Sequence, residues 1–291
     1  GYLGVFRPKS RARTKEDARR VDGCAIFFKS ELFDLLDLQL IEFQQVAMNK
    51  YEQLTGKKTN NSHDSGLNRL MTKDNIALVV LLRVKSRART RLPHDRLMVV
   101  NTHIHWDPEY CDVKLMQTQL MLEQLEELNA RYLAQSNKER GKQSQGWLPM
   151  LLCGDFNSMP DSGVYQLLHT GHVDSNHQDF VDYQYGTYTA TTGTGLNHNV
   201  PLRSAYAQVG GEPPFTNFTS EFVGVLDYIW YTPHALTPLR VLKGVDPSIV
   251  LSSYGALPNP FMCSDHIPLL VEMLFASPQS GFAGSPQKFK H

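Results

Sequence analysis

The chain has 291 residues, of which 41% are hydrophobic and 20% charged, so it can bury a substantial core and is neither disordered nor fibrous. The 29 Lys and Arg residues balance 29 Asp and Glu residues, which argues against a protein that grips its partner mainly by bulk positive charge. No stretch approaches the roughly 18 consecutive apolar residues of a membrane span.

The N-terminal half alternates polar loops with apolar strands. Residues 7–20 and 83–96 are basic and residues 49–66 are polar, so each segment predicts a loop. Strands are expected where apolar and β-branched residues follow one another, at 23–29, 36–43, 76–84 and 97–101.

The C-terminal half contains the expected helices. Apolar residues recur at helical spacing over 111–133, and a shorter helix is expected over 162–168, after a Pro-Asp cap. The remaining elements of this half are strands at 149–153, 226–231 and 267–274 and polar loops at 135–146 and 183–200.

These elements predict one α/β (α+β) domain, because strands mix with few helices in no regular βαβ alternation. We expect the domain over residues 1–276 and a flexible tail over 277–291, which is rich in Ser, Gly, Pro and Lys. The four cysteines lie far apart with no C-x-x-C pair, which favours reduced thiols in a cytosolic or nuclear protein over a zinc site.

Polar residues that could carry chemistry follow several predicted strands. His103 and His105 stand at i and i+2 after the strand at 97–101, which would place both imidazoles on one side of the strand axis. The pair could equally be two hydrogen-bonded, partly buried histidines. A further cluster of polar residues, at 67–75, is interpreted as a structural loop.

Asp155 and Asn157 share one face where the strand at 149–153 ends. A carboxylate beside a carboxamide can hold a hard cation and orient a water or a phosphate, although a capping Asp in a turn has the same pattern. Asp227 interrupts an apolar strand, and a buried carboxylate needs a partner. We expect His266, which follows Asp265, to be that partner, since the carboxylate would fix its tautomer.

The order of these clusters resembles the exonuclease–endonuclease–phosphatase superfamily, whose members share the DNase I-like fold. Longer blocks look like the carbon catabolite repressor 4-type deadenylases, which are catalytic subunits of a cytoplasmic deadenylase complex. The resemblance runs from Gly1 to Leu274. The blocks are VDGCAIFFK at 21–29, LNRLMTKDNIA at 67–77, HWDPEYCDVKLMQT at 105–118, PDSGV at 160–164 and SAY at 204–206.

The resemblance implies a four-layer sandwich of two mixed β-sheets flanked by helices. It also implies a 3′–5′ exoribonuclease that removes poly(A) tails, with Mg²⁺ as cofactor, two ions bound and Mn²⁺ able to substitute. The implied partners are the 3′ end of poly(A) RNA and the other subunits of the deadenylase complex, with no membrane and no DNA.

Residue by residue, the resemblance assigns Asp155 to bind or activate the attacking water and Asn157 to position the water and the scissile phosphate. Asp227 would hold His266, which would contact the phosphate. Asp265 would serve a second metal position. The metal ligands are thus expected to be Asp155, Asn157 and Asp265.

The same resemblance assigns substrate contacts. His103 would hydrogen-bond a phosphate oxygen or assist the leaving group. Pro108 and Phe222 would flank the 3′-terminal adenine. Stacking tolerates every base, so a preference for adenine would also need hydrogen bonds to the edge of the base.

One departure from the family pattern is serious. The principal metal ligand of the family is a Glu on an early strand, which would lie upstream of Gly1. We therefore expect the chain to be a fragment that lacks the first strands and is nearly inactive and poorly stable by itself. Two alternatives stay open: a nocturnin-like or phosphoinositide-type phosphatase acting on a small substrate, and an inactive scaffold.

Overall fold

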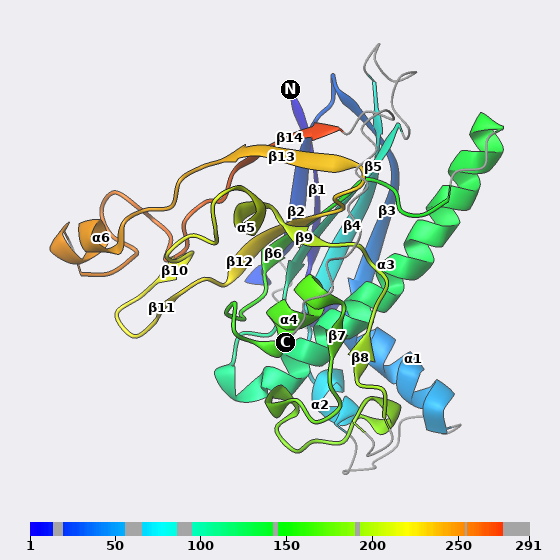
Figure 1. Cartoon of the computed structure of the whole chain (residues 1–291), viewed down its shortest axis with the longest axis horizontal. Helices are drawn as coiled ribbons and strands as arrows, with labels where there is room; N and C mark the ends of the chain where they lie inside the picture. The colour runs from blue at the N-terminus through cyan, green and yellow to red at the C-terminus, as the bar shows by residue number, and fades with distance from the viewer. Residues whose placement is uncertain are drawn as a thin grey trace, which may run out of the picture.

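The computed structural model describes residues 1–13, 20–55, 66–85, 95–141, 145–189, 193–253 and 255–275. A six-stranded mixed sheet in the order β3-β4-β5-β6-β12-β9 forms its centre (Figure 1). The strands are β3 (Phe33–Glu42), β4 (Ile76–Val84), β5 (Arg96–His103), β6 (Met150–Asp155), β9 (Arg203–Ser204) and β12 (Asp227–Tyr231). β5 and β6 run parallel, and the other neighbouring strands are antiparallel.

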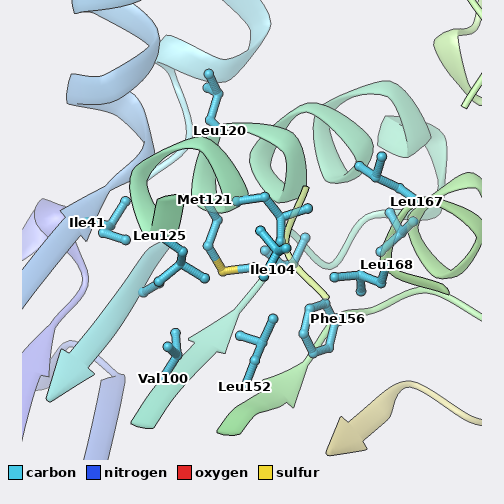
Figure 2. Packing of buried hydrophobic residues seen from close by; sticks show 14 of the residues in the cluster. Ile41, Val100, Ile104, Leu120, Met121, Leu125, Leu152, Phe156, Leu167 and Leu168 are labelled. Carbon is cyan, nitrogen blue, oxygen red and sulfur yellow. The ribbon is translucent and has the colours of Figure 1, made fainter. Parts of the chain in front are cut away.

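Helices cover one face of this sheet, and the alternation of side chains along each strand explains why. In β4, Ala77, Val79 and Leu81 are buried in the cluster on the helix side. Figure 2 shows Met121 and Leu125 of the long helix packed over the strands. The helices of the fold are α1 (Phe43–Thr55), α2 (Leu67–Met71), α3 (Cys111–Arg140), α4 (Gly163–Thr170), α5 (Ala205–Val209) and α6 (Pro247–Ser253).

Two antiparallel two-stranded sheets, called the hairpins below, lie on the opposite face. β1 (Tyr2–Pro8) pairs with β2 (Gly23–Lys29), and β13 (Leu236–Val241) pairs with β14 (Val271–Phe275). The alternate residues of β4 pack against the first hairpin, and those of β12 pack against the second. Two short ribbons complete the strands: β7 (His172–Val173) with β8 (Leu196–Asn197), and β10 (Asn217–Phe218) with β11 (Val223–Gly224).

The predicted α/β class and most predicted strands are confirmed. The expected second mixed sheet is represented, within the described ranges, by the two separate hairpins. No helix among these residues is both long and apolar enough to cross a membrane. The predicted tail at 277–291 lies outside the described residues.

Several predicted boundaries were wrong because tertiary packing overrides local polarity. The expected loop at 49–66 begins with the end of α1, which buries Phe43, Ala47 and Tyr51 at helical spacing. α3 continues six residues into the expected loop at 135–146, and Gly141 ends it in the left-handed region at φ 60°. The ends of the chain differ too: β1 covers the start of the expected basic loop at 7–20, and β14 begins at Val271 rather than at 267.

Candidate active site

Three polar side chains form one row across the central sheet. The strand register pairs His103 of β5 with Asp155 of β6, and Asp155 with Asp227 of β12. Directly paired residues point to the same face of a sheet. The alternation along β12 puts Asp227 on the face of Ile229, which packs toward the hairpins. The row therefore faces away from α1, α3 and α4.

Asp227 and His266 form the closest pair of the site. His266 Nδ1 donates to Asp227 Oδ2 across 2.7 Å, which confirms the expected partnership. This hydrogen bond and the nearby carboxylates raise the pKa of His266 to about 9, so the ring is an imidazolium at neutral pH. A backbone bridge between Asn217 and His266 fixes the loop that carries the ring. The pair thus presents a fixed positive charge beside Asp155.

Asp155 and Asn157 are tied together at the end of β6. The Asn157 backbone N–H donates to Asp155 Oδ1 at 2.8 Å, and its side-chain amide donates to the Ile104 carbonyl at 3.0 Å. Asn157 lies in the left-handed region at φ 46°, which Asn tolerates better than most residues. The strand before it requires Gly154, since a Cβ there would lie 2.1 Å from the Thr102 carbonyl oxygen. The turn therefore holds the two functional side chains in contact, with Asn157 Nδ2 donating to Asp155 Oδ2 at 3.3 Å.

Burial and the Asp227 carboxylate raise the pKa of Asp155 to about 7. Ligand atoms of Asp155, Asp227 and His266 lie within 4.8 Å of one another. Two carboxylates this close repel each other, and a divalent cation would relieve the repulsion while accepting the oxygen ligands that Mg²⁺ prefers. The residues fit such an ion, with Asp155 and Asp227 as the donors and His266 as a charged neighbour.

His103 completes the row in its neutral form. Its Nε2 lies 3.6 Å from Asp155 Oδ2, and burial together with the Lys9 charge lowers its pKa to about 4. On the other side the Nδ1 of His103 lies 4.0 Å from Asp22 Oδ2. The same carboxylate oxygen forms an ion pair with Lys9 Nζ at 2.6 Å. The sequence analysis missed both Asp22 and Lys9. Two signals for Asp22 were available: its place in the VDGCAIFFK block at 21–29 and its position directly before a predicted strand.

His105 does not join His103, contrary to expectation. β5 ends at His103, so the alternation of the strand does not extend two residues further. The His105 ring instead packs edge-on against Tyr110, with ring centroids 5.1 Å apart. Burial lowers the pKa of His105 to about 4 as well.

Two cavities adjoin at this edge of the sheet. The first, about 460 Å³, is lined by His103, Asp155 and Asp227. The second, about 700 Å³, is lined by Asn157 together with both residues expected to hold a base, Pro108 and Phe222. Asn157 thus stands beside the acidic row and inside the larger, more apolar cavity.

Two further residues bear on the expected ligand set. Asp265 is not part of the three-residue group. Its carboxylate accepts from Asn217 Nδ2 at 3.2 Å, and its role in binding a metal stays a prediction. Lys114, which the sequence analysis did not single out, is buried and donates to the Asn157 carbonyl at 2.9 Å. Burial lowers the pKa of Lys114.

The chain belongs to the Endonuclease/Exonuclease/phosphatase family, whose profile matches residues 6–266. Within that family it is similar to the "CCR4-Not complex 3′-5′-exoribonuclease subunit Ccr4" of Yarrowia lipolytica, with 40% identity over 99% of this chain and 40% of the relative. A "CCR4-NOT transcription complex subunit 6-like" protein of Danio rerio is 37% identical over 96% of this chain and 51% of the relative. The chain therefore spans between two fifths and about half the length of these relatives.

Solved structures confirm the DNase I-like fold. ANGEL2, described as a 2′,3′-cyclic phosphatase, superposes with a TM-score of 0.66 at 24% identity. The match covers 94% of this chain and 74% of the ANGEL2 chain. The human Nocturnin catalytic domain gives a TM-score of 0.54 at 22% identity, over 95% of this chain and 73% of that one. At these identities the likeness concerns the fold alone.

Proposed function

We propose that this chain carries the catalytic site of a metal-dependent 3′–5′ exoribonuclease that removes adenylates from the tail of messenger RNA. The observation that carries the proposal is the row of His103, Asp155 and Asp227, with His266, beside a cavity of about 700 Å³ that Pro108 and Phe222 line. Similarity to proteins named as 3′–5′-exoribonuclease subunits supports RNA as the substrate.

The residues of the row suit attack on a phosphodiester. Asp155 accepts a hydrogen bond from the attacking water and acts as the general base. Asn157 orients the water and a phosphate oxygen through its amide. His266, held as an imidazolium by Asp227, stabilises the negative charge that grows on the phosphate.

His103 serves the other side of the reaction. As a neutral imidazole it donates a hydrogen bond to a phosphate oxygen or to the departing 3′ oxygen. The 3′-terminal base would lie between Pro108 and Phe222, which line the larger cavity. Stacking on Phe222 contributes on the order of 1–3 kcal/mol and leaves the choice of adenine to polar groups of the cavity.

A divalent cation at Asp155, when bound, would polarise the phosphate and lower the pKa of a coordinated water. We propose Mg²⁺ as this ion, with two ions bound and Mn²⁺ as a substitute, and with Asn157 and Asp265 as further ligands. Membership of a deadenylase complex, and action in the cytoplasm or nucleus, are proposed on the same similarity.

The test is a tail-shortening assay. A 5′-labelled RNA ending in twenty adenylates is incubated with this chain, with an N-terminally extended form, and with the Asp227→Asn variant of each. Mg²⁺, chelator and an RNA with a non-adenylate 3′ end provide the conditions. Stepwise loss of adenylates that needs Mg²⁺ and Asp227 is expected from the extended form. Similar activity of both forms would refute the expectation of a missing upstream ligand.

The same assay separates the alternatives. A small-substrate phosphatase would leave the tail intact and would release phosphate from a dinucleotide 2′-phosphate or a phosphoinositide. A scaffold would bind oligo(A) without Mg²⁺ and turn over none of these substrates. Either result would overturn the exoribonuclease proposal.

A further inference from the structure

A continuous row of aromatic rings and one guanidinium leads away from the larger cavity. Trp106, which lines that cavity, lies 6.3 Å from the His105 ring, and His105 lies 5.1 Å from Tyr110. The Arg69 guanidinium then lies 4.4 Å from the Tyr110 ring and 3.9 Å from the Tyr183 ring. We call these five residues the stacking row. They come from α2, the segment before α3 and the loop after Phe180 (Figure 1).

The centre of the stacking row is held rigidly. Arg69 donates to both carboxylate oxygens of Asp112, at 2.8 and 3.2 Å, and Asp112 is fully buried. The Tyr185 hydroxyl donates to the same carboxylate at 2.5 Å. Asp112 binds one edge of the guanidinium. Its flat faces lie against the rings of Tyr110 and Tyr183. Rings held in this way lose little freedom when a ligand stacks on them.

Lys73 adds a positive charge to the stacking row. Its Nζ lies 3.8 Å above the centre of the Tyr110 ring. Within the described part of the chain, no carboxylate oxygen lies within 4.0 Å of this nitrogen, whereas Asp112 neutralises Arg69. A half-buried ammonium over an aromatic ring, without an ion pair, can donate a hydrogen bond to a phosphate oxygen, whose negative charge then balances its own.

Both ends of the stacking row are open to solvent. Trp106 is 67% exposed and Tyr183 is 40% exposed. A large aromatic side chain in water at each end, with a cation between, is the combination that proteins use to bind single-stranded nucleic acid without reading its sequence. Since Trp106 also lines the cavity with Pro108 and Phe222, a strand whose last base fills that cavity would meet Trp106 next.

We propose that the stacking row is a binding site for the single-stranded RNA that precedes the 3′-terminal nucleotide. Bases stack on Trp106 and Tyr183, and Lys73 binds a phosphate between them. This inference rests on the proposed function in one respect only, since that function places the RNA end in the adjoining cavity. The assignment also gives a role to Arg69 and Lys73, which belong to a cluster interpreted from the sequence as a structural loop.

The experiment measures binding separately from cleavage. Fluorescence anisotropy of 5′-labelled A20 and A2 is recorded in chelator, at several salt concentrations, for the full chain and for the Trp106→Ala and Lys73→Gln variants. Matched controls lie on the first hairpin: Phe27→Ala, at a ring that is 69% exposed, and Lys29→Gln, at an ammonium 5.9 Å over the Tyr2 ring. Thermal unfolding of every variant checks that it is folded.

We expect Trp106→Ala to weaken binding of A20 and of A2 by about tenfold, because the second base of A2 already reaches Trp106. Lys73→Gln should lower the slope of log affinity against log salt by about one, as the loss of one phosphate contact predicts. The controls should match the unmodified chain. Equal affinities of all four variants for A20 would overturn the inference. If binding depends on the row but no form of the protein shortens the tail, the inference stands and the proposed function fails.

Discussion

The two faces of the central sheet perform different tasks, and adjacent residues of the sequence are divided between them. Phe156 is fully buried on the helix side, where it packs against Tyr228 with ring centroids 5.9 Å apart. Asp155, one residue earlier, faces the hairpins and lies in the polar row. The helix side is therefore a closed apolar core, while the hairpin side ends in a charged, partly exposed site.

The hairpin side is also less completely covered. Large apolar side chains of both hairpins are exposed there: Tyr2, Leu3, Phe6, Phe27, Leu239 and Leu274. On the helix side, by contrast, α1, α3 and α4 bury most apolar residues completely. The difference indicates that stability comes mainly from the helix side, which leaves the other face free to hold mutually repelling carboxylates.

The largest expected effect is on the helix side. Phe156→Ala should lower the free energy of unfolding by about 3–5 kcal/mol, because it leaves a cavity in a closed core. Chemical denaturation measures the loss. The control is Phe261→Ala, at a ring that is 81% exposed, which should cost less than about 0.5 kcal/mol. Similar losses for the two variants would contradict the contrast between core and surface.

A substitution at the neighbouring residue, Asp155, should affect activity rather than stability. Asp155→Asn is expected to lower tail shortening by about 10²–10⁴-fold, the usual contribution of a positioned general base. Its free energy of unfolding should change by less than about 1 kcal/mol, because the amide keeps the shape and removes the repulsion with Asp227. Rate measurements on the form that shortens A20, with denaturation in parallel, test both parts. A strongly destabilised Asp155→Asn chain would show that the row supports the fold.

Asn157 separates backbone strain from chemistry. Since its φ is 46°, Asn157→Gly should be about 1–2 kcal/mol more stable than Asn157→Ala, although both lose the functional amide. The same two replacements at Ser158, whose φ is not positive, should rank in the reverse order. Thermal and chemical unfolding of the four variants checks the ranking, and identical rankings at both positions would sink the strain argument.

Mg²⁺ should stabilise the folded chain by binding at Asp155, on the hairpin side of the sheet. At a Mg²⁺ concentration tenfold above its Kd, the stabilisation is about 1.4 kcal/mol and appears as a higher Tm. Asp155→Asn should abolish the shift, and Phe261→Ala should retain it. A KCl solution of matched ionic strength controls for screening. An undiminished shift in the Asp155→Asn chain would place the ion elsewhere.

The smallest expected effect concerns pH. Burial lowers the pKa of His198, whose Nε2 donates to the Leu167 carbonyl and whose Nδ1 accepts from the Val200 N–H. Below the unfolded-state pKa of about 6.5, protons bind the unfolded chain more readily, so stability is present above that pH and declines as pH falls. His198→Gln should flatten this decline between pH 7.5 and 5.5. An unchanged slope in denaturation curves would assign the decline to other groups.

The local patterns of the sequence predicted much of the site. A carboxylate inside an apolar strand indicated that Asp227 needed a partner, and His266 is that partner at 2.7 Å. The Asp155 and Asn157 spacing predicted a joint orientation, which two hydrogen bonds secure. Runs of apolar residues also predicted five of the six strands of the central sheet, and only the two-residue β9 was missed.

By itself, then, the sequence determined most strands of the central sheet, the family and the candidate polar residues, because these follow from residue types and their order along the chain. Tertiary structure alone decided which of these residues meet. The register of β5, β6 and β12 aligned His103 with both carboxylates, and the packing of α2 against α3 assembled the stacking row. Such contacts join residues that are far apart along the chain, and no spacing within one segment specifies them.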